Sequence, residues 1–288
     1  MPSATTSQPA AASSSLQSAR KAHAPIQILS TPSAQTYSHV HPLLVLSVFA
    51  LRFRALVDDP QSTLLLLLPL IAVLQGVYVV ICLPAAGRDS GSTGPSTSKG
   101  PRGKRRGDGA GSNAIGGKIT AAILSLTLPL LLGTPLLTIL LILFGAPLTT
   151  HLPHTALCAS HVAVLTGTSL VYVHGTDSGA WHEIWGVSRA LDTVWAAAVG
   201  TGVGAWLGAV PIPLDWDRPW QAYPITIITG AYIGYAIGCA AGRTPLIYGR
   251  RIQFTTSEED EVGTQEQEKK QNDQPRPSGT ITTKGAAK

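Results

Sequence analysis

The sequence predicts an all-α, polytopic membrane protein, and three observations support this prediction. Of the 288 residues, 44% are hydrophobic and only 13% are charged, about half the charged fraction of an ordinary soluble domain. The mean hydropathy is +0.21. Six apolar runs each approach or exceed the ~20 residues that cross a bilayer. We therefore expect six transmembrane helices in a bundle with disordered termini, and a soluble enzyme is excluded.

The predicted spans follow one another with short connections except after the second. They cover residues 39–57, 64–83, 119–144, 152–173, 192–210 and 223–242. The third span contains Pro129 and Pro135, so it predicts a kinked or tilted helix whose freed carbonyl groups find partners on neighbouring helices. Together these runs define a membrane domain over residues 39–252.

Three polar segments surround the spans. Residues 1–38 are rich in Ser, Ala and Pro and lack the apolar core of a signal peptide, so they predict a disordered arm, with a transit peptide as a lesser alternative. Residues 85–117 form a Gly/Ser/Pro-rich linker, and residues 253–288 form a charged, disordered tail. The linker ends in a basic cluster, Arg102, Lys104, Arg105 and Arg106. Beside a membrane this cluster favours a topology signal and a weak contact with anionic lipid over nucleic-acid binding.

The distribution of Lys and Arg predicts the orientation of the chain. Six crossings place both termini, the 85–117 linker and the 174–191 connection on one side, and nearly all juxtamembrane Lys and Arg fall there. The 211–222 loop, on the other side, carries only Arg218. The positive-inside rule therefore predicts cytosolic termini and a luminal or exterior 211–222 loop.

The residues offer little that could carry chemistry. Cys82, Cys158 and Cys239 lie apart in apolar runs, which predicts buried thiols rather than a disulfide framework or a zinc site. His161 is expected to be a neutral imidazole that hydrogen-bonds to a neighbouring helix, although a relay or ligand role is an alternative. We predict no catalytic residue, no metal and no cofactor.

The acidic residues of the 211–222 loop support the main alternative. Asp215 and Asp217, together with Arg218, could hold a metal or a phospholipid head group, which would make the chain a membrane enzyme or carrier. The same residues could equally be turn acids that stabilise a proline-rich loop and pair with Arg218. A lipid-translocating or channel-like bundle is a third possibility, although polar residues within the spans are scarce.

Glycines recur every four residues in the last two spans. Gly200, Gly204 and Gly208 form one row, and Gly230, Gly234, Gly238 and Gly242 form the other. Four-residue spacing places each row along one helix face, where a second helix can approach closely. Two interpretations are open: the rows pack against each other, or they receive a helix from a partner protein.

The loop between these spans is dense in rigid and aromatic residues. It contains Pro211, Pro213 and Pro219 beside Trp206, Trp216, Trp220 and Tyr223. Tryptophan is enriched at membrane interfaces, but the density here exceeds that need. Proline lowers the entropy lost on docking, and Trp and Arg dominate binding hot spots. We therefore expect a rigid recognition loop.

The same residues resemble the PIG-F family of glycosylphosphatidylinositol (GPI) anchor biosynthesis proteins. The similar stretches are Gly204–Ala209, Pro211–Trp216, Arg218–Gln221, Pro224–Ile225, Gly230–Ala231, Gly234–Tyr235, Arg250–Arg251 and Phe144–Pro147. The resemblance covers about 50 residues, and the apolar pattern of residues 39–251 is compatible with the rest. Tyr223 departs from the family, which often has tryptophan at this position.

The resemblance implies a non-catalytic protein of the endoplasmic reticulum. Members of the family stabilise large, alkaline-phosphatase-like subunits that add ethanolamine phosphate to mannose of the GPI precursor on the luminal side. We therefore expect this chain to bind such subunits and membrane lipid, and not nucleic acid. The expected partner-binding residues are Gly204, Trp206, Gly208, Pro211, Pro213, Asp215, Trp216, Asp217, Arg218, Pro219, Trp220, Gly230, Gly234 and Gly238.

Overall fold

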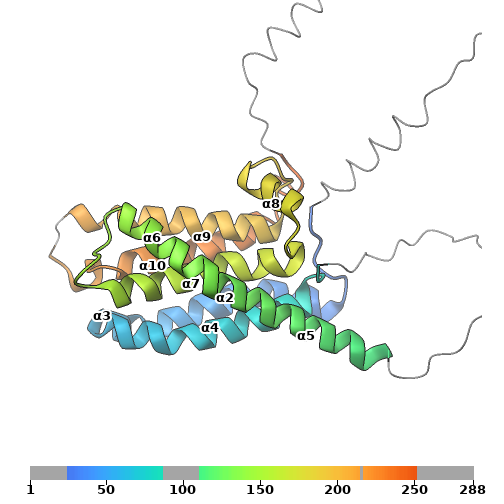
Figure 1. Cartoon of the computed structure of the whole chain (residues 1–288), viewed down its shortest axis with the longest axis horizontal. Coiled ribbons are helices and arrows are strands. Elements are labelled where there is room, and N and C mark those ends of the chain that lie inside the picture. Colours follow the sequence, from blue (N-terminus) through green and yellow to red (C-terminus); the bar gives the residue numbers. More distant parts are fainter. Residues whose placement is uncertain (1–24, 87–109, 215–216, 252–288) are drawn as a thin grey trace, which may run out of the picture. The chain divides into compact units, whose positions relative to one another are not determined.

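The computed structural model describes residues 25–86, 110–214 and 217–251 (Figure 1). Every regular element in these ranges is a helix, so the predicted all-α class is confirmed for them. The helices pack side by side, and each apolar run of the sequence is helical over most of its length.

The first helix, α2 (Pro32–Leu51), begins seven residues before the predicted span at 39. Thr31 caps it by accepting a hydrogen bond from the Ala34 amide at 3.4 Å, and Pro32 stands in the first turn, where its missing N–H costs nothing. A break at Arg52 separates α2 from the short helix α3 (Phe53–Asp58). The predicted disordered arm 1–38 is therefore wrong over its last seven residues.

The segment before α2 is also held by the rest of the chain. The Ile26 amide donates to the Asp192 carboxylate at 3.1 Å, and the Leu29 amide donates to the Cys82 carbonyl at 2.9 Å. These bonds between residues far apart in sequence order a segment that composition alone assigns to the arm. Residues 1–24 lie outside the described residues, as does the predicted tail from residue 252 on.

Helix α4 (Pro60–Cys82) follows, and α5 (Ala110–Leu128) begins inside the predicted linker 85–117. Residues 87–109, which contain the basic cluster, lie outside the described residues. At Pro129 the α-helix changes to the π-helical turn η1 (Pro129–Gly133) and resumes as α6 (Thr134–Leu143). Proline lacks the N–H that continues the ladder, which accounts for an irregularity where the sequence predicts a kink.

Helix α7 (Leu152–His174) is the centre of the packing. It contacts α4, α5, α6, α9 and α10, and most of its residues are buried. The short helix α8 (Ser178–Trp185) follows it, and then α9 (Thr193–Ala209) and α10 (Ile225–Ala241) make the most extensive helix pair of the chain.

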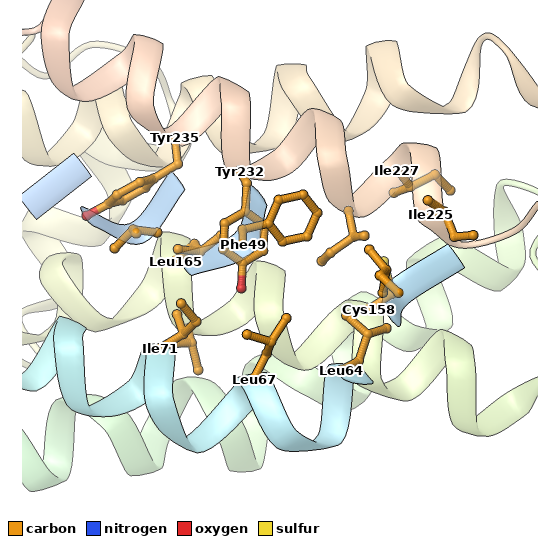
Figure 2. Packing of buried hydrophobic residues seen from close by; sticks show 14 of the residues in the cluster. Phe49, Leu64, Leu67, Ile71, Cys158, Leu165, Ile225, Ile227, Tyr232 and Tyr235 are labelled. Carbon is orange, nitrogen blue, oxygen red and sulfur yellow. The ribbon is translucent and has the colours of Figure 1, made fainter. Parts of the chain in front are cut away.

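Buried apolar side chains from α2, α4, α7 and α10 meet in the middle of the bundle (Figure 2). Phe49 stacks on Tyr232 with ring centroids 4.3 Å apart, and Leu67, Ile71 and Leu165 pack in the same cluster. All three cysteines are free and buried, as predicted.

Four helical stretches are long and apolar enough to cross a membrane, so a polytopic membrane protein is supported by their length and composition. They are Pro60–Cys82, Ile115–Leu143, Leu152–His174 and Thr193–Leu214. Helix α10 is apolar but has only 17 residues, and α2 begins with a polar turn. The predicted count of six spans is therefore not confirmed.

Candidate partner-binding site

The two glycine rows face each other. A Cβ atom added to Gly204 would lie 2.1 Å from the Gly230 carbonyl oxygen, and one added to Gly230 would lie 2.1 Å from the Gly204 oxygen. Gly200 and Gly234 show the same reciprocal approach at 2.3 and 2.0 Å. Because an added Cβ takes the place of an α-hydrogen, these hydrogens point at carbonyl oxygens of the other helix, the geometry of weak Cα–H···O bonds.

Mutual packing, one of the two interpretations left open by the sequence, is thus what the structure shows. Gly208 approaches the Thr226 carbonyl, and Gly238 approaches that of Ala196. The chain itself fills the surfaces that the glycines leave open, so Gly204, Gly208, Gly230, Gly234 and Gly238 are not available to a partner's helix at these contacts. They hold α9 against α10, and any contribution to partner binding is indirect.

Helix α10 is held from its other faces by two tyrosine–histidine pairs. His161 Nε2–H donates to the Leu64 carbonyl at 3.0 Å, which leaves Nδ1 to accept from the Tyr232 hydroxyl at 2.7 Å. The predicted hydrogen bonds of the His161 imidazole to neighbouring helices are therefore present. His41 Nε2 and the Tyr235 hydroxyl share a second bond of 3.1 Å, which joins α2 to α10.

The loop between α9 and α10 contains two short 3₁₀ turns, η2 (Ile212–Leu214) and η3 (Pro219–Gln221). The buried Gln221 side chain donates from Nε2 to the Pro211 carbonyl and so closes the loop across ten residues. The Gln221 amide also donates to the Arg218 carbonyl at 2.9 Å. These two hydrogen bonds connect Pro211, Arg218 and Gln221 in the described part of the loop, and the rigidity expected from the sequence stays a prediction.

A second contact ties the loop to the central helix. The Tyr223 hydroxyl donates to Thr155 Oγ1 at 2.9 Å, and Thr155 in turn donates to the His151 carbonyl at 3.2 Å. Thr155 stands in the first turn of α7. The Tyr223 hydroxyl thus connects the loop to α7.

Several predicted contact residues are exposed around this framework. Trp206 on α9 is 64% exposed and Trp220 on η3 is 37% exposed. Pro213 and Arg218 are exposed too, whereas Pro211 is half-buried. Exposed tryptophan is typical of protein–protein contact surfaces.

The residues of the enzymatic alternative are only partly described. Asp217 is exposed and has a left-handed backbone (φ 51°), a conformation that Asp tolerates better than most residues. Asp215 lies outside the described residues, as does Trp216. Within the described ranges, no three His, Cys, Asp or Glu side chains gather closely enough to hold a metal ion.

At the opposite end of the helix pair, Asp192 caps α9. Its buried carboxylate accepts from the Trp195 amide at 2.8 Å and from the Ile26 amide at 3.1 Å. Burial raises the pKa of Asp192, although these amides and the Arg189 cation act in the opposite direction. Beyond α10, the Leu191 amide donates to the Arg250 carbonyl at 2.8 Å, so both ends of the pair are fixed.

Sequence reasoning overlooked the residues that give the loop its shape. Gln221 appears in the similar stretches but carries no predicted role, and Thr155 is absent from every expectation. A polar amide between tryptophan and tyrosine near a membrane surface was the available signal for Gln221. Thr155 gives no such signal, because its partner Tyr223 is 68 residues away.

The described residues form an all-helical array in which four stretches are long and apolar enough to cross a membrane, as in a polytopic membrane protein. The GPI biosynthesis protein family Pig-F matches residues 40–243, well over half of the chain. The chain therefore belongs to this family, and the resemblance noted in the sequence is confirmed. Its place is in GPI-anchor biosynthesis.

Curated relatives extend this result. The chain is 47% identical over 264 residues to glycosylphosphatidylinositol anchor biosynthesis protein 11 of Aspergillus fumigatus, which covers 82% of this chain and 88% of that protein. The Neurospora crassa protein of the same name is 45% identical over 228 residues, covering 79% and 81%.

A human relative carries a more specific name, GPI ethanolamine phosphate transferase, stabilizing subunit. It is 36% identical over 123 residues, which are 41% of this chain and 55% of the human protein. No solved structure matches this chain.

Proposed function

We propose that this chain is the non-catalytic, stabilising subunit of a GPI ethanolamine-phosphate transferase in the endoplasmic reticulum membrane. The human and mouse relatives are named as stabilizing subunits of such a transferase, and this name carries the proposal. The partner would be a catalytic subunit that adds ethanolamine phosphate to mannose of the GPI precursor. The family resemblance favours an alkaline-phosphatase-like partner with its active site in the lumen.

We propose that the partner binds the 210–224 loop and the outward face of α9. Val203, Trp206 and Val210 are exposed at three- and four-residue spacing on this face, which is the spacing of residues that pack against another helix. Gly202 lies on the same face with open space beside it. Trp220 and Arg218 continue the surface onto the loop. The α9–α10 contact and the Gln221 bond support the proposal, because they fix this surface before the partner arrives.

Co-purification from mild detergent tests the surface. Trp206→Ala, and Trp216→Ala combined with Trp220→Ala, are each expected to reduce recovery of the catalytic subunit and its abundance in cells. Trp185→Ala is the matched control, since Trp185 is 74% exposed but belongs to α8. If the loop variants retain the partner as well as the control does, the assigned surface is wrong. Transfer of ethanolamine phosphate by the purified chain alone, abolished in Asp217→Asn, would overturn the non-catalytic role.

We further propose six crossings with both termini in the cytosol and the 210–224 loop in the lumen. In this arrangement α2 and α10 cross together with the four longer stretches, and the membrane domain ends near Arg251. The native cysteines are all buried, so a cysteine introduced at Arg218 or Arg250 can be labelled selectively. In sealed microsomes a membrane-impermeant maleimide is expected to label Arg250→Cys and to spare Arg218→Cys. The reverse pattern would refute this topology.

A further inference from the structure

An apolar groove with a volume of about 520 Å³ opens between α9 and the η1–α6 segment, with α7 as its floor. Its lining side chains are nearly all aliphatic or aromatic. The one hydroxyl among them, that of Thr166, donates to the Val162 carbonyl at 2.8 Å within α7. The groove is therefore lined almost entirely by apolar side chains.

The irregular turn at Pro129 packs against α7 beside the groove. Pro129 packs against Gly167 so closely that a Cβ atom on Gly167 would lie 2.7 Å from the proline ring. Gly133 lines the groove beside Ala163. Small residues on both helices thus let η1 approach α7 closely.

The length of the groove separates the possible occupants. Its lining on α7 extends from Ala163 to Val171, which is about 12 Å of helix at 1.5 Å per residue. On α9 it extends only from Trp195 to Val199. A transmembrane helix of a partner needs about 30 Å of apolar contact, whereas this groove spans roughly the depth of one leaflet.

The two ends of the groove also differ. Towards the middle of the helices, the Thr134 hydroxyl donates to Ser160 Oγ at 3.4 Å, where α6 and α7 come together. At the other end, Trp181 and Trp185 of α8 line the opening. Tryptophan favours the head-group level of a bilayer, so α8 marks an interface and the groove runs from it towards the bilayer centre.

We propose that this groove binds one acyl chain of a glycerophospholipid from the leaflet at the α8 end. The chain enters beside Trp181 and Trp185, lies along α7 and ends near Gly133. Each methylene of the acyl chain that moves from the bulk lipid into the groove gains dispersion contacts with the packed side chains of its walls. The fixed walls favour a bound lipid that persists through purification. Under the proposed topology this is the cytosolic leaflet, and binding requires no catalytic subunit.

Photolabelling of the full chain in phosphatidylcholine vesicles tests the proposal. The vesicles carry a trace of phosphatidylcholine with a diazirine in the middle of one acyl chain, and adducts are mapped by mass spectrometry. We expect adducts on Leu132, Leu136 and Val199 at about ten times the yield found on Ile237, which is exposed on α10 outside the groove. Tenfold corresponds to about 1.4 kcal/mol. Equal yields would show ordinary lipid contact and overturn the proposal.

A matched pair of variants supplies the second readout. Ala198→Trp fills the groove. Ala240→Trp adds the same side chain at an exposed position in the last turn of α10, outside the groove. Ala198→Trp is expected to abolish the excess labelling and reduce the phospholipid that co-purifies, and Ala240→Trp is expected to change neither. If Ala198→Trp does not fold, the adduct yields at the individual positions of the native chain still test the proposal. Crosslinks from a photoreactive residue at Val199 to another polypeptide, or to a second copy of this chain, would replace the lipid as the occupant and refute the proposal.

Discussion

Gly204→Ala is the substitution whose effect follows most directly from the structure. The added methyl group would lie 2.1 Å from the Gly230 carbonyl oxygen and 2.9 Å from the Gly234 Cα atom. Both obstacles are backbone atoms, so no side chain can rotate away. The helices would have to separate by about 1.3 Å to lengthen the closest approach to the 3.4 Å of ordinary contact. Such a shift also disturbs the neighbouring Gly200 and Gly208 contacts.

Overpacking of this kind costs about 1–3 kcal/mol. In a chain of this size a loss of about 2 kcal/mol lowers the melting temperature by roughly 4–8 °C. Gly202→Ala is the control, because Gly202 lies on the same helix with open space beside it. Alanine is favoured over glycine in a helix by about 1 kcal/mol, so this control is expected to be neutral or stabilising.

Thermal unfolding of both variants in detergent, followed by size-exclusion chromatography, measures the difference. The shared gain in helix propensity cancels between them, which leaves the cost of the α9–α10 contact. If Gly204→Ala is as stable as Gly202→Ala, the close helix pair is not present in the protein and the origin of the fixed loop must be sought elsewhere.

Two further predictions concern buried polar groups. His161→Phe removes the imidazole that bonds to the Tyr232 hydroxyl and the Leu64 carbonyl, so it is expected to lower the free energy of unfolding by about 1–3 kcal/mol. Tyr232→Phe is expected to lower it less. Equal stability of the native chain and both variants in thermal unfolding would contradict this. Asp192 has a raised pKa, so the stability it contributes is complete at acidic pH and decreases as the pH rises through that raised value. Asp192→Asn keeps the helix cap and is expected to remove this decrease, which begins as the pH rises above the ordinary Asp pKa of about 4, whereas Asp192→Ala loses about 1 kcal/mol of capping at every pH. An unchanged pH profile in Asp192→Asn would refute the assignment.

The sequence predicted those features of the fold that depend on residues close together in the chain, and it did not predict those that depend on contacts between distant segments. Hydropathy placed the starts of α9 and α10 within two residues, because apolar composition along a helix is a local property. Four-residue spacing identified both glycine rows, yet it could not decide between mutual packing and a partner's helix. That choice depends on which helix each glycine row contacts. The contact is set by the packing of the helices against one another, and the sequence of a single helix does not determine it.

Tertiary contacts explain where the sequence boundaries failed. Composition assigned residues 25–38 to a disordered arm because residues 1–38 are rich in Ser, Ala and Pro and lack a continuous apolar core. In the structure the backbone amides of Ile26 and Leu29 find acceptors on Asp192 and Cys82. Backbone hydrogen bonds carry no composition signal, so this order was invisible in the sequence. The first turns of α5 extend into the predicted linker in the same way.

Glycines and tryptophans in this region should therefore affect a partner by different routes. Trp206 is exposed, so its loss removes contact surface and leaves the helix pair intact. Gly204 is enclosed by α10, so its substitution disturbs the surface from beneath without touching the partner. Trp206→Ala is expected to keep the melting temperature and lose the partner, whereas Gly204→Ala is expected to lower both. If Trp206→Ala lowers the melting temperature as much as Gly204→Ala does, Trp206 is part of the fold, and the binding surface would have to lie on other exposed residues of the loop.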